Sequence, residues 1–189
     1  NDLRADTVGD EFGVQYVILG GGDEYERIND IKNTQATFIL PLNFPKAYDV
    51  ENTFLTNSLE LEAMKEWNQR PSNPMALDVN GVSFAFTTKG LKSMKDFKAN
   101  LKKATDYRLD KVTALEALTT QPAQILGNSK LGNLNVGSYA NFLITSGDVF
   151  EDKTTLYENW VNGSRTVFED LSKKDIRGSY SFMIHKDNY

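Results

Sequence analysis

The sequence contains no cysteine and a single histidine, His185, close to the C-terminal end of the chain. Without cysteine there is no thiol nucleophile, no disulfide and no Cys-ligated zinc or iron–sulfur site. One histidine excludes metal sites that need two histidines from this chain, and it excludes a Ser-His-Asp triad unless His185 folds back. The residue types that remain leave open only a carboxylate-rich Mg²⁺ or Ca²⁺ site.

Long apolar runs and clusters of positive charge are also missing. No apolar segment approaches the roughly 20 residues that a membrane-spanning helix needs, and residues 1–6 do not resemble a signal peptide. The formal net charge is −5, and no segment gathers Lys and Arg into a basic stripe. We therefore expect neither a membrane span nor a nucleic-acid partner. With 40% hydrophobic residues, the chain has enough apolar side chains for an ordinary folded core.

The first ninety residues alternate between apolar strands and helices. Near-continuous apolar runs predict three strands, over 14–19, 36–42 and 82–88. The segments between them predict helices: one from its cap Asp23 to about Lys32, one from about Asn57 to Gln69, and a short one with Asn73 as its N-cap. This alternation is typical of a parallel sheet with right-handed crossovers.

The second half changes from helices to short strands. Capping residues predict three helices, which begin at Ser93, Asp110 and Thr120. Beyond Gly132 the apolar period is two, which predicts strands over 141–145, 157–161, 164–168 and 179–184. The dipeptide Asn162-Gly163 between two alternating runs is a strong hairpin signal, because both residues of such a turn need positive φ.

Three parallel strands are too few for a closed barrel, which takes eight strands and about 250 residues. An open parallel sheet would leave long strand edges exposed, which proteins generally avoid. We therefore expect the exposed sheet edge to be covered by the remaining part of the same polypeptide or by another copy of the chain.

Residues 114–127 resemble the segment that follows the last barrel strand in the amidohydrolase superfamily. Residues 131–144 are similar to the continuation of that segment, and residues 160–163 match the closing hairpin of the superfamily's small β-domain. The order and spacing agree over roughly residues 73–168. Residues 14–72 resemble a branch of secreted bacterial proteins related to imidazolonepropionase.

The resemblance implies a fold and a location. The three parallel strands would be the last three of a (β/α)₈ barrel, so the fold class is α/β, with a partial TIM barrel followed by helices and a small antiparallel β-domain. Residues 1–130 would form the partial barrel, and residues 131–189 the accessory sheet with its Asn-Gly hairpin. A periplasmic or extracellular location is implied by the resemblance alone.

The resemblance also implies a chemistry. The superfamily hydrolyses C–N bonds in amides, ureas and cyclic amides, using one or two divalent metals that activate a water. A histidine ligand would be expected after the first strand of this chain, where Gly20–Gly22 stand, and an aspartate ligand after the third strand, where Lys89 stands. We therefore expect no metal site and no cofactor in this chain. A divalent metal such as Zn²⁺ is expected only for the intact site of the superfamily.

Four polar residues are candidates for a site at the rim of the sheet: Asp23, Asn43, Thr88 and Lys89. Each lies at or just beyond the carboxyl end of a predicted parallel strand, and active sites of barrel folds lie where such strands end. Lys89 is a candidate catalytic lysine with a lowered pKa, and the alternative is a solvated lysine. Gly20–Gly22 lack the G-x-G-x-x-G spacing of a phosphate-binding loop, so a tight turn explains them better. His185 is predicted to be a surface residue.

Three functions are compatible with these features. The chain is predicted to be the C-terminal segment of an amidohydrolase-like protein that is not catalytic by itself. The alternative is a non-catalytic, degenerate barrel that serves as an interaction or scaffolding module. A free-standing α/β binding protein is the third possibility, and it predicts a monomer with no apolar edge exposed.

Overall fold

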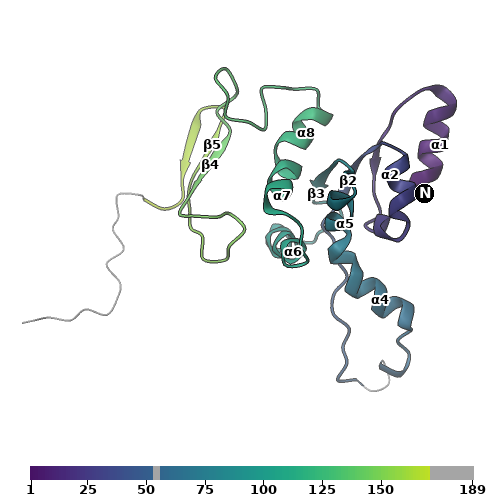
Figure 1. Cartoon of the computed structure of the whole chain (residues 1–189). Coiled ribbons are helices and arrows are strands. Elements are labelled where there is room, and N and C mark those ends of the chain that lie inside the picture. Colours follow the sequence, from purple (N-terminus) through teal and green to yellow (C-terminus); the bar gives the residue numbers. More distant parts are fainter. Residues whose placement is uncertain (53–55, 171–189) are drawn as a thin grey trace, which may run out of the picture.

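The computed structural model describes residues 1–52 and 56–170 (Figure 1). Three parallel strands form a sheet in the order β1-β2-β3: β1 (Val17–Leu19), β2 (Thr37–Pro41) and β3 (Phe84–Thr87). The register pairs Ile18 with Phe38, and Phe38 with Phe84, so these three side chains share one face of the sheet. The predicted α/β class and parallel sheet are confirmed, although β1 comprises only the last three residues of the predicted strand.

Short helices precede and connect these strands. They are α1 (Asp2–Phe12), the 3₁₀-helix η1 (Glu24–Arg27), α2 (Ile28–Asn33), α4 (Leu61–Gln69), the 3₁₀-helix η2 (Arg70–Ser72) and α5 (Asn73–Val79). The sequence analysis missed α1, which is a polar helix whose one fully buried residue is Gly9. It ends at Gly13, whose φ of 64° provides the left-handed conformation that terminates many helices.

Two predicted helix caps make no capping hydrogen bond, although Asp23 does stand at the N-cap position of a helix. The side chain of Asp23 makes no capping hydrogen bond, and the 3₁₀-helix η1 begins at the next residue. Asn73 lies inside α5 instead of before it, because its side-chain Oδ1 accepts a hydrogen bond from the backbone N–H of Tyr25 at 2.8 Å. The predicted helix from Asn57 begins later, at Leu61, and has no side-chain cap. For Asn73, a contact distant in sequence replaces the local capping contact.

Three further helices follow β3, as predicted: α6 (Met94–Asp106), α7 (Lys111–Leu118) and α8 (Thr120–Ile125). Ser93 caps α6 by accepting the backbone N–H of Lys95 on its hydroxyl at 3.2 Å. Asp110 caps α7 by accepting the backbone N–H groups of Val112 and Thr113 at 2.8 and 3.1 Å. These two caps are confirmed because they depend only on neighbouring residues.

One hydrophobic core joins the sheet to the helices. Phe38, on the central strand, is fully buried, and so is Leu77 of α5. The core also takes in side chains from α2, α6 and α7, among others Ile31, Leu101, Ala104, Ala114 and Ala117. Of the helices in the described residues, none is long and apolar enough to cross a membrane.

A second, antiparallel sheet contains β4 (Phe142–Thr145), β5 (Leu156–Val161) and β6 (Ser164–Val167) in that order. Asn162 and Gly163 both have positive φ, 48° and 80°, which confirms the predicted hairpin. On one face Phe142 stacks against Trp160 with ring centroids 5.4 Å apart, and the buried Glu158 pairs with Arg165 on the next strand. The predicted strand over 179–184 and His185 lie outside the described residues.

The loop between β4 and β5 attaches this sheet to the helices. Phe150 inserts into the hydrophobic core and retains only 7% of its accessible surface. Beside it, the ammonium group of Lys111 pairs with Asp148 at 2.7 Å and with Glu151 at 2.6 Å, which raises the pKa of Lys111. The loop therefore shares a core with the helices. These contacts do not define a domain boundary, so the predicted boundary at residue 130 stays a prediction.

We expect Phe150→Ala to lower the free energy of unfolding by about 3 kcal/mol, because it removes a buried aromatic ring and leaves a cavity. Phe168→Ala is the matched control, since Phe168 is 56% exposed. Urea denaturation followed by circular dichroism measures both variants. Equal denaturation midpoints for the two variants would contradict the anchoring role of Phe150.

Candidate functional site

The carboxyl ends of the three parallel strands meet at one edge of the sheet, and the four predicted rim residues all follow these ends. Asp23 follows β1, Asn43 follows β2, and Thr88 and Lys89 follow β3. All four residues are exposed. Asn43 lies against the turn after β3, because a Cβ atom built on Gly90 would be only 2.7 Å from the Asn43 Nδ2 atom. The structure thus brings Asn43 next to the Thr88-Lys89 turn.

A buried glutamate that the sequence analysis missed organises the turn after β1. Glu24 is almost fully buried. Its Oε1 atom accepts the backbone N–H groups of Gly21 and Gly22 at 2.6 and 3.1 Å, and its Oε2 atom accepts a hydrogen bond from the side-chain amide of Asn73. Asn73 stands at the first turn of α5. One carboxylate therefore ties the β1 turn to the start of α5.

The glycines after β1 are explained by this carboxylate. A Cβ atom on Gly20 would lie 2.3 Å from the Oε1 atom of Glu24, which is much closer than any real contact allows. Gly22 has a φ of 89°, a conformation that residues with a side chain rarely adopt. Since the N–H groups of Gly21 and Gly22 already bind Glu24, they are not free to bind a phosphate.

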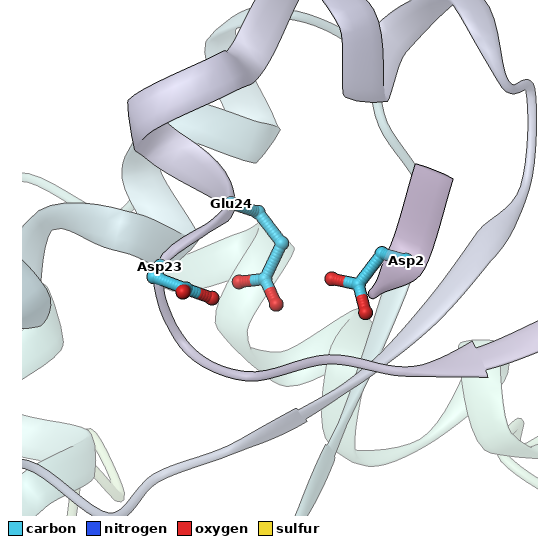
Figure 2. A group of neighbouring side chains, drawn as sticks. All are labelled: Asp2, Asp23 and Glu24. Atoms are coloured by element: carbon cyan, nitrogen blue, oxygen red, sulfur yellow. The ribbon is translucent and has the colours of Figure 1, made fainter. Parts of the chain in front are cut away.

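Three carboxylates gather at this point: Asp2 from the start of α1, Asp23 from the turn, and Glu24 from η1 (Figure 2). One oxygen atom from each lies within 4.8 Å of the others. Burial and the negative charge of Glu24 raise the pKa of Asp2. Oxygen donors of this kind suit hard cations such as Mg²⁺ or Ca²⁺. However, both oxygens of Glu24 already accept hydrogen bonds from the protein, which explains its burial without an ion.

Positive charge also reaches this turn. Arg70, in η2, donates a hydrogen bond from Nη1 to the carbonyl oxygen of Gly21 at 3.3 Å and pairs with Glu66 at 2.6 Å. The guanidinium therefore lies beside the acidic group and partly balances its charge. Tyr25 stands close by, and burial together with nearby carboxylates raises the pKa of its hydroxyl.

The sequence of residues 50–177 matches the profile of the Amidohydrolase family, which is more than half of the chain. The chain belongs to the amidohydrolase family. A comparison with curated proteins gives no match. The family match includes β3, all the helices from α4 onward and the second sheet, but it does not include β1 or the carboxylates beside it.

Solved structures show the same fold. An amidohydrolase from Thermotoga maritima superposes with a TM-score of 0.66 at 21% identity, over 88% of this chain and 40% of that one. Another amidohydrolase gives a TM-score of 0.59 at 18% identity, over 88% and 43%. A prolidase in complex with N-methylphosphonate-L-proline gives 0.58 at 17% identity, also over 88% and 43%. The chain thus spans less than half the length of these proteins.

Two positions can be compared with the ligands that the amidohydrolase resemblance implies. Gly20–Gly22 have no side chain that could ligate a metal, and Lys89 presents a cation where an aspartate is implied. Neither position offers a metal ligand of the implied kind, and a degenerate metal site in this chain stays a prediction. The carboxylates of Asp2, Asp23 and Glu24 are a different donor set, so the expectation that this chain holds no metal stays a prediction.

We expect Glu24→Ala to lower the free energy of unfolding by about 3 kcal/mol, because it leaves two backbone N–H groups and the amide of Asn73 without an acceptor. Glu26→Ala is the control, since Glu26 is exposed two residues away. Chemical denaturation of both variants measures the difference. A loss no larger than that of the control would show that the carboxylate does not hold the turn.

We expect Asp2→Asn to stabilise the protein near neutral pH. The raised pKa of Asp2 means that the folded state binds its proton more tightly than the unfolded state, so stability is lost as pH rises through the raised pKa. The asparagine variant escapes this loss, and its advantage should vanish below the ordinary pKa of 3.8. Denaturation midpoints across this pH range test it, with Asp152→Asn, an exposed loop residue, as control. An advantage for Asp2→Asn that does not change with pH would show that the raised pKa of Asp2 is not its cause.

Proposed function

We propose that this chain is the C-terminal segment of an amidohydrolase-type protein that hydrolyses non-peptide C–N bonds, and that the chain is not catalytic by itself. The observation that carries the proposal is the composition of the carboxyl edge. This edge has the barrel architecture in which active sites lie at strand ends. Yet it presents glycines after β1 and Lys89 after β3.

The chain's own residues suit the wall of a site better than its reactive centre. Asn43, Thr88 and Lys89 are exposed polar groups at the rim, where they would contact a polar substrate. Glu24 has both oxygens engaged by donors of its own chain, so it holds the turn in shape. A metal bound at the intact site of the family would activate a water molecule. The ligands for such a metal would have to come from outside this chain.

A non-catalytic module is the second candidate, and the position of Lys89 favours it. An ammonium group repels a divalent cation and offers no acceptor to an attacking water while it is protonated. If no longer form of the protein binds a metal, the barrel would serve as a scaffold or an interaction module. A free-standing binding protein is disfavoured, since it should not expose apolar side chains such as Val17 and Leu19 along a sheet edge.

We also propose that the protein belongs to a secreted branch related to imidazolonepropionase. This assignment is supported by the resemblance of residues 14–72, and it carries a periplasmic or extracellular location with it. The similarity to a prolidase structure does not support a prolyl substrate for this chain, because 17% identity supports the fold alone.

The test is the divalent metal content of the purified chain after incubation with zinc, measured by elemental mass spectrometry. We expect no stoichiometric zinc in this chain. The same measurement is made on Asp23→Asn and on the exposed control Asp30→Asn, since only Asp23 belongs to the cluster of three carboxylates. Stoichiometric zinc that disappears in Asp23→Asn would overturn the proposal and make the carboxylate group a metal centre.

The same measurement on a longer natural polypeptide that contains this chain separates the two candidates. Bound metal together with hydrolysis of a cyclic amide or urea would support the hydrolase. Absence of metal from both forms would favour the non-catalytic module.

A further inference from the structure

Helix α6 ends with an arginine in a position that favours glycine. The backbone N–H of Leu109 donates to the carbonyl oxygen of Ala104 at 3.1 Å, and that of Arg108 donates to the carbonyl oxygen of Thr105 at 3.0 Å. These two bonds form a Schellman motif, in which the residue after the helix cap adopts the left-handed conformation. This residue is Arg108, and its φ is 74°. Glycine is the usual residue here, because a side chain makes the conformation costly.

Other helices of this chain use glycine at the equivalent position. The same pair of hydrogen bonds ends α1, α5 and α8, and there the residues with positive φ are Gly13, Gly81 and Gly127. Arg108 therefore keeps a strained backbone that a glycine would relieve. Its side chain is exposed and makes no hydrogen bond or ion pair with the described residues. Internal packing thus does not explain the strain, and strain of this kind concentrates at functional positions.

Arg108 lines a cavity of about 530 Å³ between the end of α6, the start of α7 and the loop that joins β4 to β5. Leu109 and Phe150, both nearly fully buried, contribute apolar lining. A cavity of this size can hold a small organic molecule. Since α6 has 13 residues, its end lies about 20 Å from its beginning near the Lys89 turn. The cavity is therefore separate from the carboxyl edge of the sheet.

The charge of this cavity is unbalanced at one residue. The other charged side chains of the lining all have partners in the protein: Lys102 with Asp106, Lys111 with Glu151, and Asp110 with the first backbone N–H groups of α7. Among the described residues that line the cavity, the charged group left without a partner is the guanidinium of Arg108. A guanidinium binds carboxylates well, because two of its N–H groups match the two carboxylate oxygens.

We propose that this cavity is a binding site for a small organic carboxylate. The carboxylate of the ligand forms a bidentate ion pair with Arg108, and its apolar part lies against Leu109 and Phe150. Because Phe150 belongs to the β4–β5 loop, the ligand contacts both this loop and the helices, and its binding stabilises the attachment of the second sheet. This site goes beyond the proposed hydrolase function, and it does not depend on a metal at the carboxyl edge.

Benzoate is a suitable probe, since it joins a planar carboxylate to an apolar ring, and benzamide is its neutral counterpart. In an NMR titration of the isotopically labelled chain, benzoate should shift the amide signals of Arg108, Leu109 and Phe150. Benzamide should bind about tenfold more weakly or worse. In Arg108→Gly the benzoate affinity should also fall about tenfold or more, while the midpoint of urea denaturation should rise, because glycine relieves the left-handed backbone. A purely structural role of Arg108 would not produce these opposite changes.

Two further variants separate the shape of the guanidinium from its charge. Arg108→Lys keeps the charge but lacks the planar pair of donors, so its affinity for benzoate should fall about fivefold. Lys98→Gln removes an exposed cation of α6 that does not line the cavity, so it should bind benzoate like the unchanged chain.

Three results would overturn the proposal. The first is the absence of any shift of these amide signals at tens of millimolar benzoate. The second is equal affinity of Arg108→Gly and the unchanged chain for benzoate, which would reduce the effect to non-specific binding. The third is tighter binding of phenyl phosphate than of benzoate, which would assign the cavity to a phosphorylated ligand instead.

Discussion

Coverage of the parallel sheet is the constraint on which the rest of this structure depends. Ile18, Phe38 and Phe84 line one face, and the helices that connect the strands bury that face in a single core. The energetic gain from apolar burial is roughly proportional to the area removed from water. The opposite face gains much less, because Val17 and Leu19 remain partly in water. The stability of this chain is therefore concentrated around β2 and β3, and β1 is held mainly from one side.

The carboxylate of Glu24 has a comparable role at the carboxyl edge. A buried charge is tolerated only where hydrogen bonds replace its hydration, and Glu24 receives such bonds from Gly21, Gly22 and Asn73. The same contact requires glycine at position 20, since a side chain there would occupy the place of the carboxylate oxygen. The glycine run, which the sequence predicts to be a tight turn, is thus explained by the packing of an internal side chain.

Several local signals in the sequence are confirmed by the structure, whereas features that depend on distant residues could not be predicted. The caps at Ser93 and Asp110 and the turn at Asn162-Gly163 were predictable, because each is decided by neighbouring residues. Asn73 followed by proline has the pattern of a helix cap. However, its side chain forms hydrogen bonds with Tyr25 and Glu24, some fifty residues earlier. The proximity of Asp2 to Glu24 could not be predicted either, because α1 has too little apolar periodicity to be recognised as a helix.

Fold and chemistry are carried by different parts of this chain. The family match and most of the core lie in residues 50–177, whereas the carboxylates and glycines at the carboxyl edge lie before residue 25. Membership in the amidohydrolase family therefore establishes the architecture without establishing the reaction, since function depends on the groups at the site. Lys89 lies within the matched region, yet its charge differs from that of the ligand that the resemblance implies, so the family match alone does not fix the chemistry of this strand end.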